Sequence, residues 1–296
     1  MAEISAKQDT PVVSKTVPDF VETEYRDPQT GTLIRRTVYV TEVSGTRALD
    51  LYSGWDPVKS EPKFPLESLP TRIYSLVTLQ RLWLSHNLLT AIPPEICSLV
   101  QLRELFLHCN RFEAFPAHVC KLSSLEILWL DSNQIKEIPG EIASLKSLCR
   151  LHLDKNSIES FPDQLCDLRN LEVLYLNDNH LTGISENVGS LKQLRRLYLH
   201  NNKITELPNG ITQLHSLVLL NLEHNEIRHL SLGHNPGVSV SAPKLKVFST
   251  NTSRNSSRSR RHSDQVDNPI KVYTEQRKQR PSLPDQYTHR KLSMQF

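Results

Sequence analysis

The sequence predicts an elongated α/β solenoid, because one asparagine column and two leucine columns recur at a fixed interval of 23 residues. The asparagine column consists of Asn87, Asn110, Asn133, Asn156, Asn179, Asn202 and Asn225. The leucine columns consist of Leu82, Leu105, Leu128, Leu151, Leu174, Leu197 and Leu220, and of Leu84, Leu107, Leu130, Leu153, Leu176, Leu199 and Leu222. Seven consecutive registrations without an insertion make chance an implausible explanation. The repeats therefore form one stacked unit in which each repeat packs against its neighbours.

The first element of each repeat is predicted to be a short strand. In the pattern x-L-x-L-x the side chains alternate, so the two leucines face the core and the residues around them face solvent. The asparagine that follows lies where the chain turns sharply off the strand. Its amide can satisfy backbone groups that a tight turn leaves unpaired. Stacking the repeats therefore predicts a parallel sheet with a ladder of asparagines along one edge.

The second element of each repeat is predicted to be a short helical segment on the convex side. An apolar residue followed by proline opens it, and proline suits the first turn of a helix. These pairs are Leu69-Pro70, Ile92-Pro93, Phe115-Pro116, Ile138-Pro139, Phe161-Pro162 and Leu207-Pro208. The repeat that begins at Leu171 has Gly183-Ile184-Ser185 instead. We expect a local loosening of the convex side there.

The flanks divide the chain into four regions: a disordered N-terminus at 1–18, a cap at 19–68, about seven full repeats at 69–236, and a tail at 237–296. A solenoid end exposes core leucines, so its terminal unit must be atypical. β-like segments on both sides of a turn-rich stretch at 27–31 predict a hairpin. A worn repeat follows, with Leu49 and Leu51 as its core pair.

The tail differs from the rest in composition. It holds 12 Lys and Arg against 4 Asp and Glu, a net charge of +8, and ten serines. Such a segment buries too little apolar surface to offset its ordering entropy, so we expect it to be disordered. Ser263 and Ser293 follow basic residues as candidate phosphorylation sites. Lys278, Pro281 and Pro284 match a ligand pattern for SH3 domains. Each motif is short, and a solvated basic tail is the alternative interpretation.

Composition and cysteine usage favour a cytoplasmic protein, with nuclear or cytoskeletal association left open. Residues 1–19 lack the apolar core of a signal peptide, and no apolar run approaches the ~20 residues of a membrane span. The five cysteines do not form the clustered pairs that close secreted repeat proteins. We therefore expect reduced thiols and no transmembrane segment.

The residues between the two strand leucines form a candidate binding surface, the ring stripe. Its members are Trp83, Phe106, Trp129, His152, Tyr175 and Tyr198. Neighbouring strands lie ~4.8 Å apart, so these side chains form one row. Large aromatic residues favour a protein contact site. The alternative is that the rings pack side by side and stiffen the sheet.

Charged residues flank the ring stripe on both sides. Arg81, Arg150 and Arg196 lie on one side, and Asp131 and Asp154 lie on the other. Mixed charge around an aromatic centre favours a protein or peptide partner. A nucleic-acid groove needs a dominant positive field, so we expect no nucleic-acid partner.

A metal site and an active site are both disfavoured by the motifs. His108, Asp131, His152 and Asp154 project from adjacent strands and could converge on a divalent metal. No short-range ligand spacing or Cys-x-x-Cys supports that, so we expect a solvated polar patch, with no metal and no cofactor. The sequence contains no Gly-rich phosphate loop and no nucleophile motif. We therefore expect no catalytic residues.

The repeat unit L-x-x-L-x-L-x-x-N-x-L-x-x-L-P-x-x-I-x-x-L-x-x resembles the leucine-rich repeat in its 23-residue typical form. The resemblance implies a horseshoe with a parallel concave sheet. Without cysteine caps, the chain is similar to the Ras-suppressor, Erbin- and Scribble-type and plant Ras-group-related repeat proteins. That group implies a non-catalytic scaffold or adaptor, often linked to small-GTPase or kinase signalling. We expect the chain to be a monomer outside its complex. The alternative is a structural component of a cytoskeletal or axonemal assembly.

Overall fold

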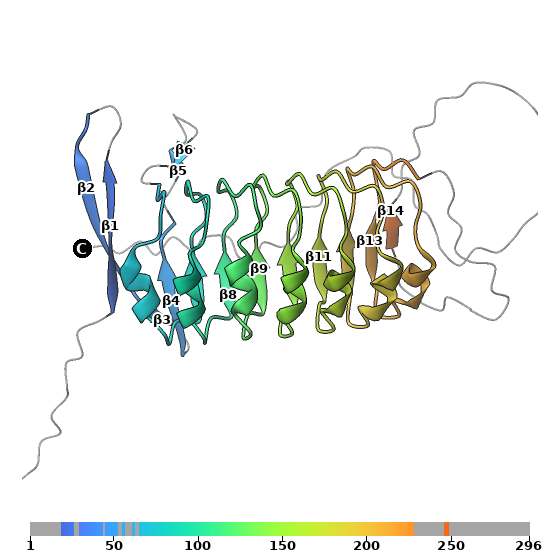
Figure 1. Ribbon diagram of the computed structural model, residues 1–296, viewed down its shortest axis with the longest axis horizontal. Helices are drawn as coiled ribbons and strands as arrows, with labels where there is room; N and C mark the ends of the chain where they lie inside the picture. The colour runs from blue at the N-terminus through green and yellow to red at the C-terminus, as the bar shows by residue number, and fades with distance from the viewer. Residues whose placement is uncertain are drawn as a thin grey trace, which may run out of the picture.

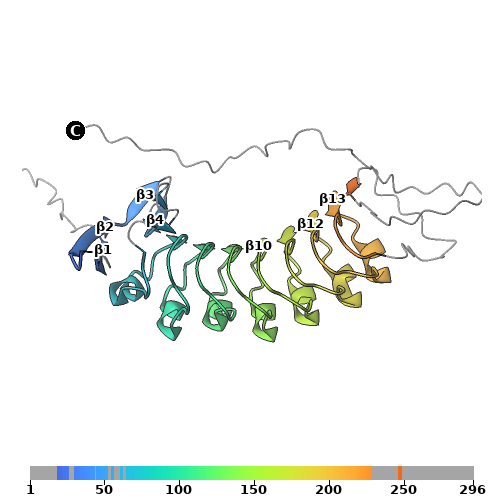
Figure 2. The same ribbon diagram turned by 90° about the horizontal axis from the view of Figure 1, so that it is seen from above.

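The molecule is a curved solenoid, as the computed structural model shows for residues 19–26, 30–43, 45–52 and 65–227 and for the backbones of 55–56, 61–62 and 246–248. Strands line the inner side of the curve and short helices line the outer side (Figures 1 and 2). The predicted α/β solenoid with a parallel concave sheet is confirmed. The helices are all 3-10 helices of five residues, because each repeat has room for little more than one turn.

A ten-stranded sheet forms the concave face, in the order β14-β13-β12-β11-β10-β9-β8-β7-β4-β3. Its strands are β3 (Thr41–Val43), β4 (Thr46–Asp50), β7 (Arg81–Trp83), β8 (Glu104–Phe106), β9 (Ile127–Trp129), β10 (Arg150–His152), β11 (Val173–Tyr175), β12 (Arg196–Tyr198), β13 (Leu219–Asn221) and β14 (Lys246–Phe248). All pair in parallel except β3, which is antiparallel to β4. β14 lies within the segment for which the composition predicts disorder, and it pairs with β13.

The convex side carries one 3-10 helix per repeat. The helices are η1 (Thr71–Ser75), η2 (Pro94–Ser98), η3 (Ala117–Lys121), η4 (Gly140–Ser144), η5 (Asp163–Asp167), η6 (Glu186–Ser190) and η7 (Asn209–Gln213). Six of them begin directly after the proline of an apolar-Pro pair, as the sequence predicts. The prediction of a local loosening at Gly183-Ile184-Ser185 is wrong. The Ser185 side chain accepts a hydrogen bond from the Asn187 N–H at 3.0 Å, so a side-chain cap replaces the proline.

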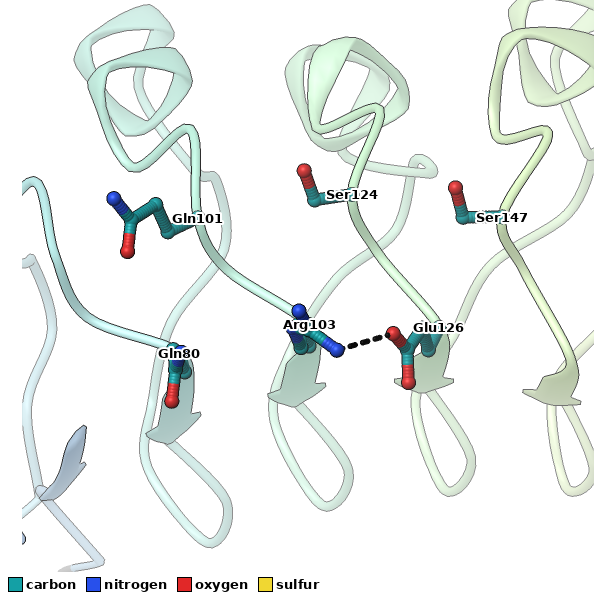
Figure 3. Close-up of a pocket in the computed structure, with 6 residues that line it drawn as sticks. All are labelled: Gln80, Gln101, Arg103, Ser124, Glu126 and Ser147. Atoms are coloured by element: carbon teal, nitrogen blue, oxygen red, sulfur yellow. Dashed lines mark hydrogen bonds and ion pairs between the residues drawn. The ribbon is translucent and has the colours of Figure 1, made fainter. Parts of the chain in front are cut away.

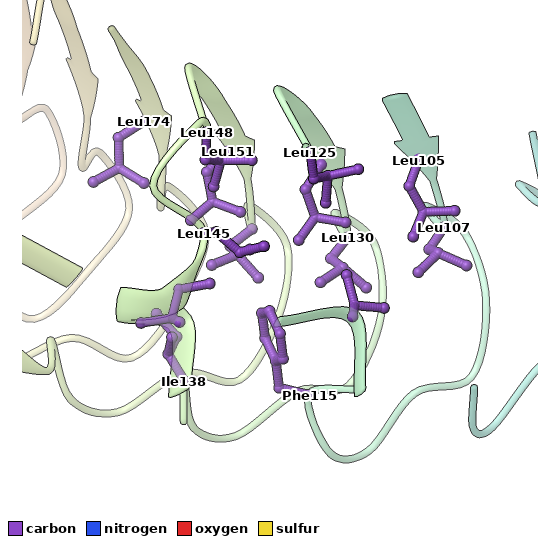
Figure 4. Packing of buried hydrophobic residues seen from close by; sticks show 14 of the residues in the cluster. Leu105, Leu107, Phe115, Leu125, Leu130, Ile138, Leu145, Leu148, Leu151 and Leu174 are labelled. Atoms are coloured by element: carbon purple, nitrogen blue, oxygen red, sulfur yellow. The ribbon is translucent and has the colours of Figure 1, made fainter. Parts of the chain in front are cut away.

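The core is a single row of leucine layers between sheet and helices (Figure 4). Leu105, Leu128 and Leu151 are register partners on adjacent strands, and each is completely buried. The fixed interval therefore places identical side chains above one another along the stack. This arrangement is what the alternating leucine pattern predicts.

The asparagine ladder closes the turn after each strand. The Asn156 Nδ2 group donates to the carbonyls of Leu153 at 3.1 Å and of Leu130, in the preceding repeat, at 3.0 Å. Its Oδ1 accepts from the Ile135 N–H at 3.0 Å. Each asparagine thus satisfies backbone groups in its own repeat and in the repeat before it.

The residue before each ladder asparagine adopts a left-handed conformation, which the sequence did not reveal. These residues are His86, Cys109, Ser132, Lys155, Asp178, Asn201 and His224, with φ between 52° and 56°. None is a glycine, and a left-handed L-residue costs about 1–2 kcal/mol. Most of the backbone N–H groups involved donate to a carbonyl of the next repeat, as in Ser132 to Asp154 at 2.9 Å. Those bonds and the adjacent amide hold the turn.

An N-terminal hairpin packs on the first turn of the stack. It consists of β1 (Phe20–Arg26) and β2 (Leu33–Tyr39), paired antiparallel, and a separate ribbon joins β5 (Trp55–Asp56) to β6 (Glu61–Pro62). Val21 is completely buried in the same cluster as Leu49 and Ile73. The hairpin therefore covers leucine surface at this end of the stack.

Candidate protein-binding face

The parallel register brings the whole ring stripe together. Trp129 is the register partner of His152, and His152 is the partner of Tyr175. The same pattern joins Trp83 to Phe106 and Tyr175 to Tyr198. All six side chains predicted for the stripe therefore lie in one row across the concave face.

The rings contact one another along this row. Tyr175 and Tyr198 are stacked, with centroids 4.2 Å apart and planes 6° from parallel. His152 stacks on Tyr175 at 4.3 Å and on Trp129 at 4.5 Å. Trp83 stacks on Phe106 at 5.4 Å, and Phe106 meets Trp129 edge-on at 5.1 Å. The rings therefore pack side by side, which is the geometry that the packing interpretation requires.

The rings differ in how much surface they leave for a partner. Trp83, Trp129, Tyr175 and Tyr198 are half-buried, so part of each ring stays accessible. Phe106 is only 6% exposed, because Trp83 and Trp129 cover it. The expectation that every stripe residue faces solvent fails at Phe106. Phe106 packs between the two tryptophans instead.

The flanking arginines fall into two groups. Arg81 forms an ion pair with Glu104, and its Cζ atom lies 5.2 Å from the centroid of the Trp83 ring. Arg150 and Arg196 are exposed. The cationic edge of the face is therefore strongest at the middle and later repeats.

The opposite flank holds a compact cluster of titratable groups. One potential ligand atom from each of Asp131, His152 and Asp154 lies within 4.8 Å of the other two. Burial, together with the nearby charge of Asp154, raises the pKa of Asp131 to about 7. Burial likewise raises the pKa of Asp154 to about 6 and lowers the pKa of His152 to about 3. The solvated patch expected from the sequence is thus a partly desolvated cluster.

Replacing Asp131 with asparagine should stabilise the fold at pH 8 by about 1–3 kcal/mol. The pKa of Asp131 is higher in the folded state, about 7 against its ordinary 3.8, so the folded state binds the proton more tightly. The stabilisation that comes from protonating Asp131 is complete below pH 3.8 and is lost as the pH rises through 7. The advantage of Asp131→Asn should therefore shrink between pH 8 and pH 4.

Urea unfolding at several pH values in the presence of a chelator measures this difference. Glu137→Gln, at an exposed carboxyl, is the control and should show no comparable trend. A stability difference that does not vary with pH would contradict the raised pKa of Asp131.

A second set of rings, which the sequence analysis missed, extends the aromatic surface toward the turns. The His86 ring meets Tyr52 at 5.2 Å and His108 at 5.5 Å, and His108 lies 5.4 Å from Trp129. Tyr52 belongs to the worn repeat, where the period is hard to follow. The sequence feature that could have predicted these contacts is the aromatic character of His86 and His108, which follow the strands.

A shallow polar depression lies beside the sheet, with a volume of about 300 Å³ (Figure 3). Its lining residues are Gln80, Gln101, Arg103, Ser124, Glu126 and Ser147. The Arg103–Glu126 ion pair crosses it at 3.1 Å. Small-molecule sites are mostly apolar and bury their ligand, so this depression does not have the character of one.

All five cysteines are free, and Cys120 and Cys166 are buried. In the part of the chain that the structure describes, no helix has the length and apolar character to cross a membrane. Ser263, Ser293, Lys278, Pro281 and Pro284 lie outside the described residues. The assignment of the ring stripe to partner binding stays a prediction.

Comparison with known proteins matches the repeats. The family model described as leucine rich repeat matches residues 77–135, 100–158, 123–181 and 169–227, which together span just over half of the 296 residues. A search of curated proteins found no match.

Many solved structures are similar to the solenoid, and two of them illustrate the likeness. A leucine-rich repeat protein of Leptospira interrogans is 42% identical over 55% of this chain, with a TM-score of 0.54. The PEPR1–AtPEP1 structure is 26% identical over 70% of this chain, with a TM-score of 0.57. This chain covers only 42% of the first protein and 29% of the second. From the repeats, the family match and these likenesses, the chain belongs to the leucine-rich repeat family.

Proposed function

We propose that this protein is a non-catalytic scaffold whose concave face binds a protein partner. Leucine-rich repeats generally mediate protein–protein interaction and are typically non-catalytic. The observation that carries the proposal is the row of half-buried rings at Trp83, Trp129, Tyr175 and Tyr198. Such rings can bury apolar area without losing much side-chain freedom, because stacking already fixes them.

The charge around the stripe indicates what kind of segment fits. Arg150 and Arg196 are exposed and lie two residues before His152 and Tyr198 on the same strands. On the opposite edge, the raised pKa values of Asp131 and Asp154 weaken the negative charge. A partner segment with apolar residues at its centre and acidic residues toward the arginine edge complements this face.

The finer proposal places this scaffold in the cytoplasm, in small-GTPase or kinase signalling. It is supported by the resemblance to the cysteine-poor intracellular repeat group and by the five free cysteines. Proximity labelling in cells followed by pull-down of the full chain identifies the partner. Recovery of partners with no connection to such signalling would remove this finer proposal and leave the binding face to be tested separately.

The double variant Trp83→Ala, Trp129→Ala should weaken binding of the identified partner by about 100-fold or more, because buried aromatic anchors typically contribute ~2 kcal/mol or more each. Calorimetric titration measures the affinity. Glu141→Ala and Lys146→Ala, on the exposed convex side, should bind as the wild type does. Thermal melting checks that the double variant remains folded.

The competing account assigns partner binding to residues 237–296 and leaves the rings with packing alone. On that account the double variant melts at a lower temperature yet binds normally, and a chain truncated after Pro236 does not bind. Normal binding by a folded double variant would therefore overturn the concave-face proposal.

A further inference from the structure

Three side chains able to bind a metal converge at the middle of the concave face. Asp131, His152 and Asp154 each place one donor atom within 4.8 Å of the other two. His152 closes β10 and pairs in register with Trp129, and the two aspartates follow these residues at equivalent positions of adjacent repeats. The Ser132 N–H donates to the Asp154 carbonyl at 2.9 Å and joins the two turns. The register of the sheet, rather than a flexible loop, therefore determines how close these three side chains lie.

The side chains around the cluster constrain its potential metal-ligand atoms. The His152 ring lies between the rings of Trp129 and Tyr175, so both its faces are covered. Asp131 Oδ2 accepts from the Ser132 hydroxyl at 3.4 Å. Asp131 Oδ1 is shielded from solvent and accepts no hydrogen bond from the residues that the structure describes. Burying a carboxylate oxygen that accepts no hydrogen bond destabilises the folded state. A cation bound to that oxygen would remove this destabilisation.

We propose that Asp131, His152 and Asp154 bind one Zn²⁺ ion through these donors, with a fourth position open on the concave face. Zinc sites with three protein ligands of the His and carboxylate type keep such an open position. At zinc–ligand distances of about 2.0–2.2 Å, tetrahedral donors lie about 3.3–3.6 Å apart, so the donors need only close by small side-chain rotations. An imidazole ligand favours zinc over Mg²⁺ and Ca²⁺, which prefer oxygen.

This proposal reverses the expectation from the sequence. His152 and Asp154 are only two residues apart, but Asp131 lies 21 residues before His152 and no Cys-x-x-Cys motif accompanies them, which was the ground for expecting no metal. The parallel register supplies the proximity that the linear sequence lacks. The proposal is independent of partner binding, because it concerns the affinity of the free protein for an ion.

Titration of the chelator-treated full-length protein with Zn²⁺, followed by calorimetry, tests the site. We expect one saturable site with a Kd on the order of 1 µM or tighter. Co²⁺ should occupy the same site and give the intense visible absorption of a four-coordinate ion. Zn²⁺ should also raise the Tm, because a ligand that binds the folded state stabilises it.

Asp154→Asn and His152→Gln should each weaken this site by on the order of 100-fold or more, since even outer-shell changes cost about 10–100-fold. His200→Gln and Glu223→Gln, which lie in the concave face at later repeats, are matched controls and should bind Zn²⁺ as the wild type does. Asp131→Asn gives a further variant that should stay folded and lose the site. In the three cluster variants every histidine and cysteine outside the cluster remains in place, so these comparisons separate the cluster from other ligands in the chain.

Two results would overturn the proposal. One is the absence of a saturable Zn²⁺ site in the wild type. The other is unchanged stoichiometry and affinity in folded Asp131→Asn and Asp154→Asn variants, which would assign the binding to adventitious ligands elsewhere in the chain.

Discussion

Replacing Leu128 with alanine should lower the free energy of unfolding by about 2–5 kcal/mol. Leu128 lies at the centre of the stack, is completely buried, and is flanked in register by Leu105 and Leu151. The smaller side chain leaves a cavity that neighbouring repeats cannot fill without shifting their own strands. Urea denaturation followed by circular dichroism measures the change.

Val100→Ala is the matched control for this core truncation. Val100 is also apolar, yet it is 60% exposed on the surface, so its loss should cost less than about 0.5 kcal/mol. A loss below about 1 kcal/mol for Leu128→Ala would mean that the register of the repeats is not the one described here.

Replacing Asn156 with alanine should cost on the order of 3 kcal/mol, although it removes only one amide group. Asn156 is 7% exposed, and its side chain serves the Ile135 N–H and the carbonyls of Leu130, Leu153 and Asp154. Each buried backbone group left unpaired costs about 1–3 kcal/mol. Denaturant unfolding gives the total loss.

Hydrogen exchange at Ile135 separates the loss of this hydrogen bond from general destabilisation. The Ile135 amide should exchange much faster in Asn156→Ala than in the wild type, beyond the change at amides two repeats away. Asn170→Ala is the matched control, because Asn170 also bonds to a preceding repeat, at 2.8 Å to the Lys146 carbonyl, but is exposed. Equal losses for the two asparagines would refute a structural role of burial in the ladder.

The parts of the fold that could be predicted are those that repeat. The leucine column from Leu82 to Leu220 predicts a buried residue in each of seven repeats, and all seven leucines are buried in the structure. Ser185 is the exception, because the missing proline predicts a loosening that the structure does not show. A serine at the same place caps the helix through its side chain, and a single position carries no periodic signal.

The candidate site was predictable in its composition and less so in its physical state. The alternation of the strand identified the ring stripe, but it gave no indication that Phe106 is covered by its neighbours. It placed Asp131 and Asp154 on adjacent strands, but their desolvation depends on the packing of rings around them. Burial at a surface of this kind arises from side-chain contacts between repeats, which a single repeat does not encode.

The asparagine ladder has a mechanical consequence. Since each amide connects its own repeat only to the one before it, as Asn156 does to Leu130, a tensile load along the solenoid acts on links between neighbours. A repeat of 23 residues spans only ~4.8 Å along the stack, and once unfolded it extends to about 80 Å. Under force the molecule is therefore a series of breakable extensible units, and its stiffness depends on the weakest junction rather than on the whole core.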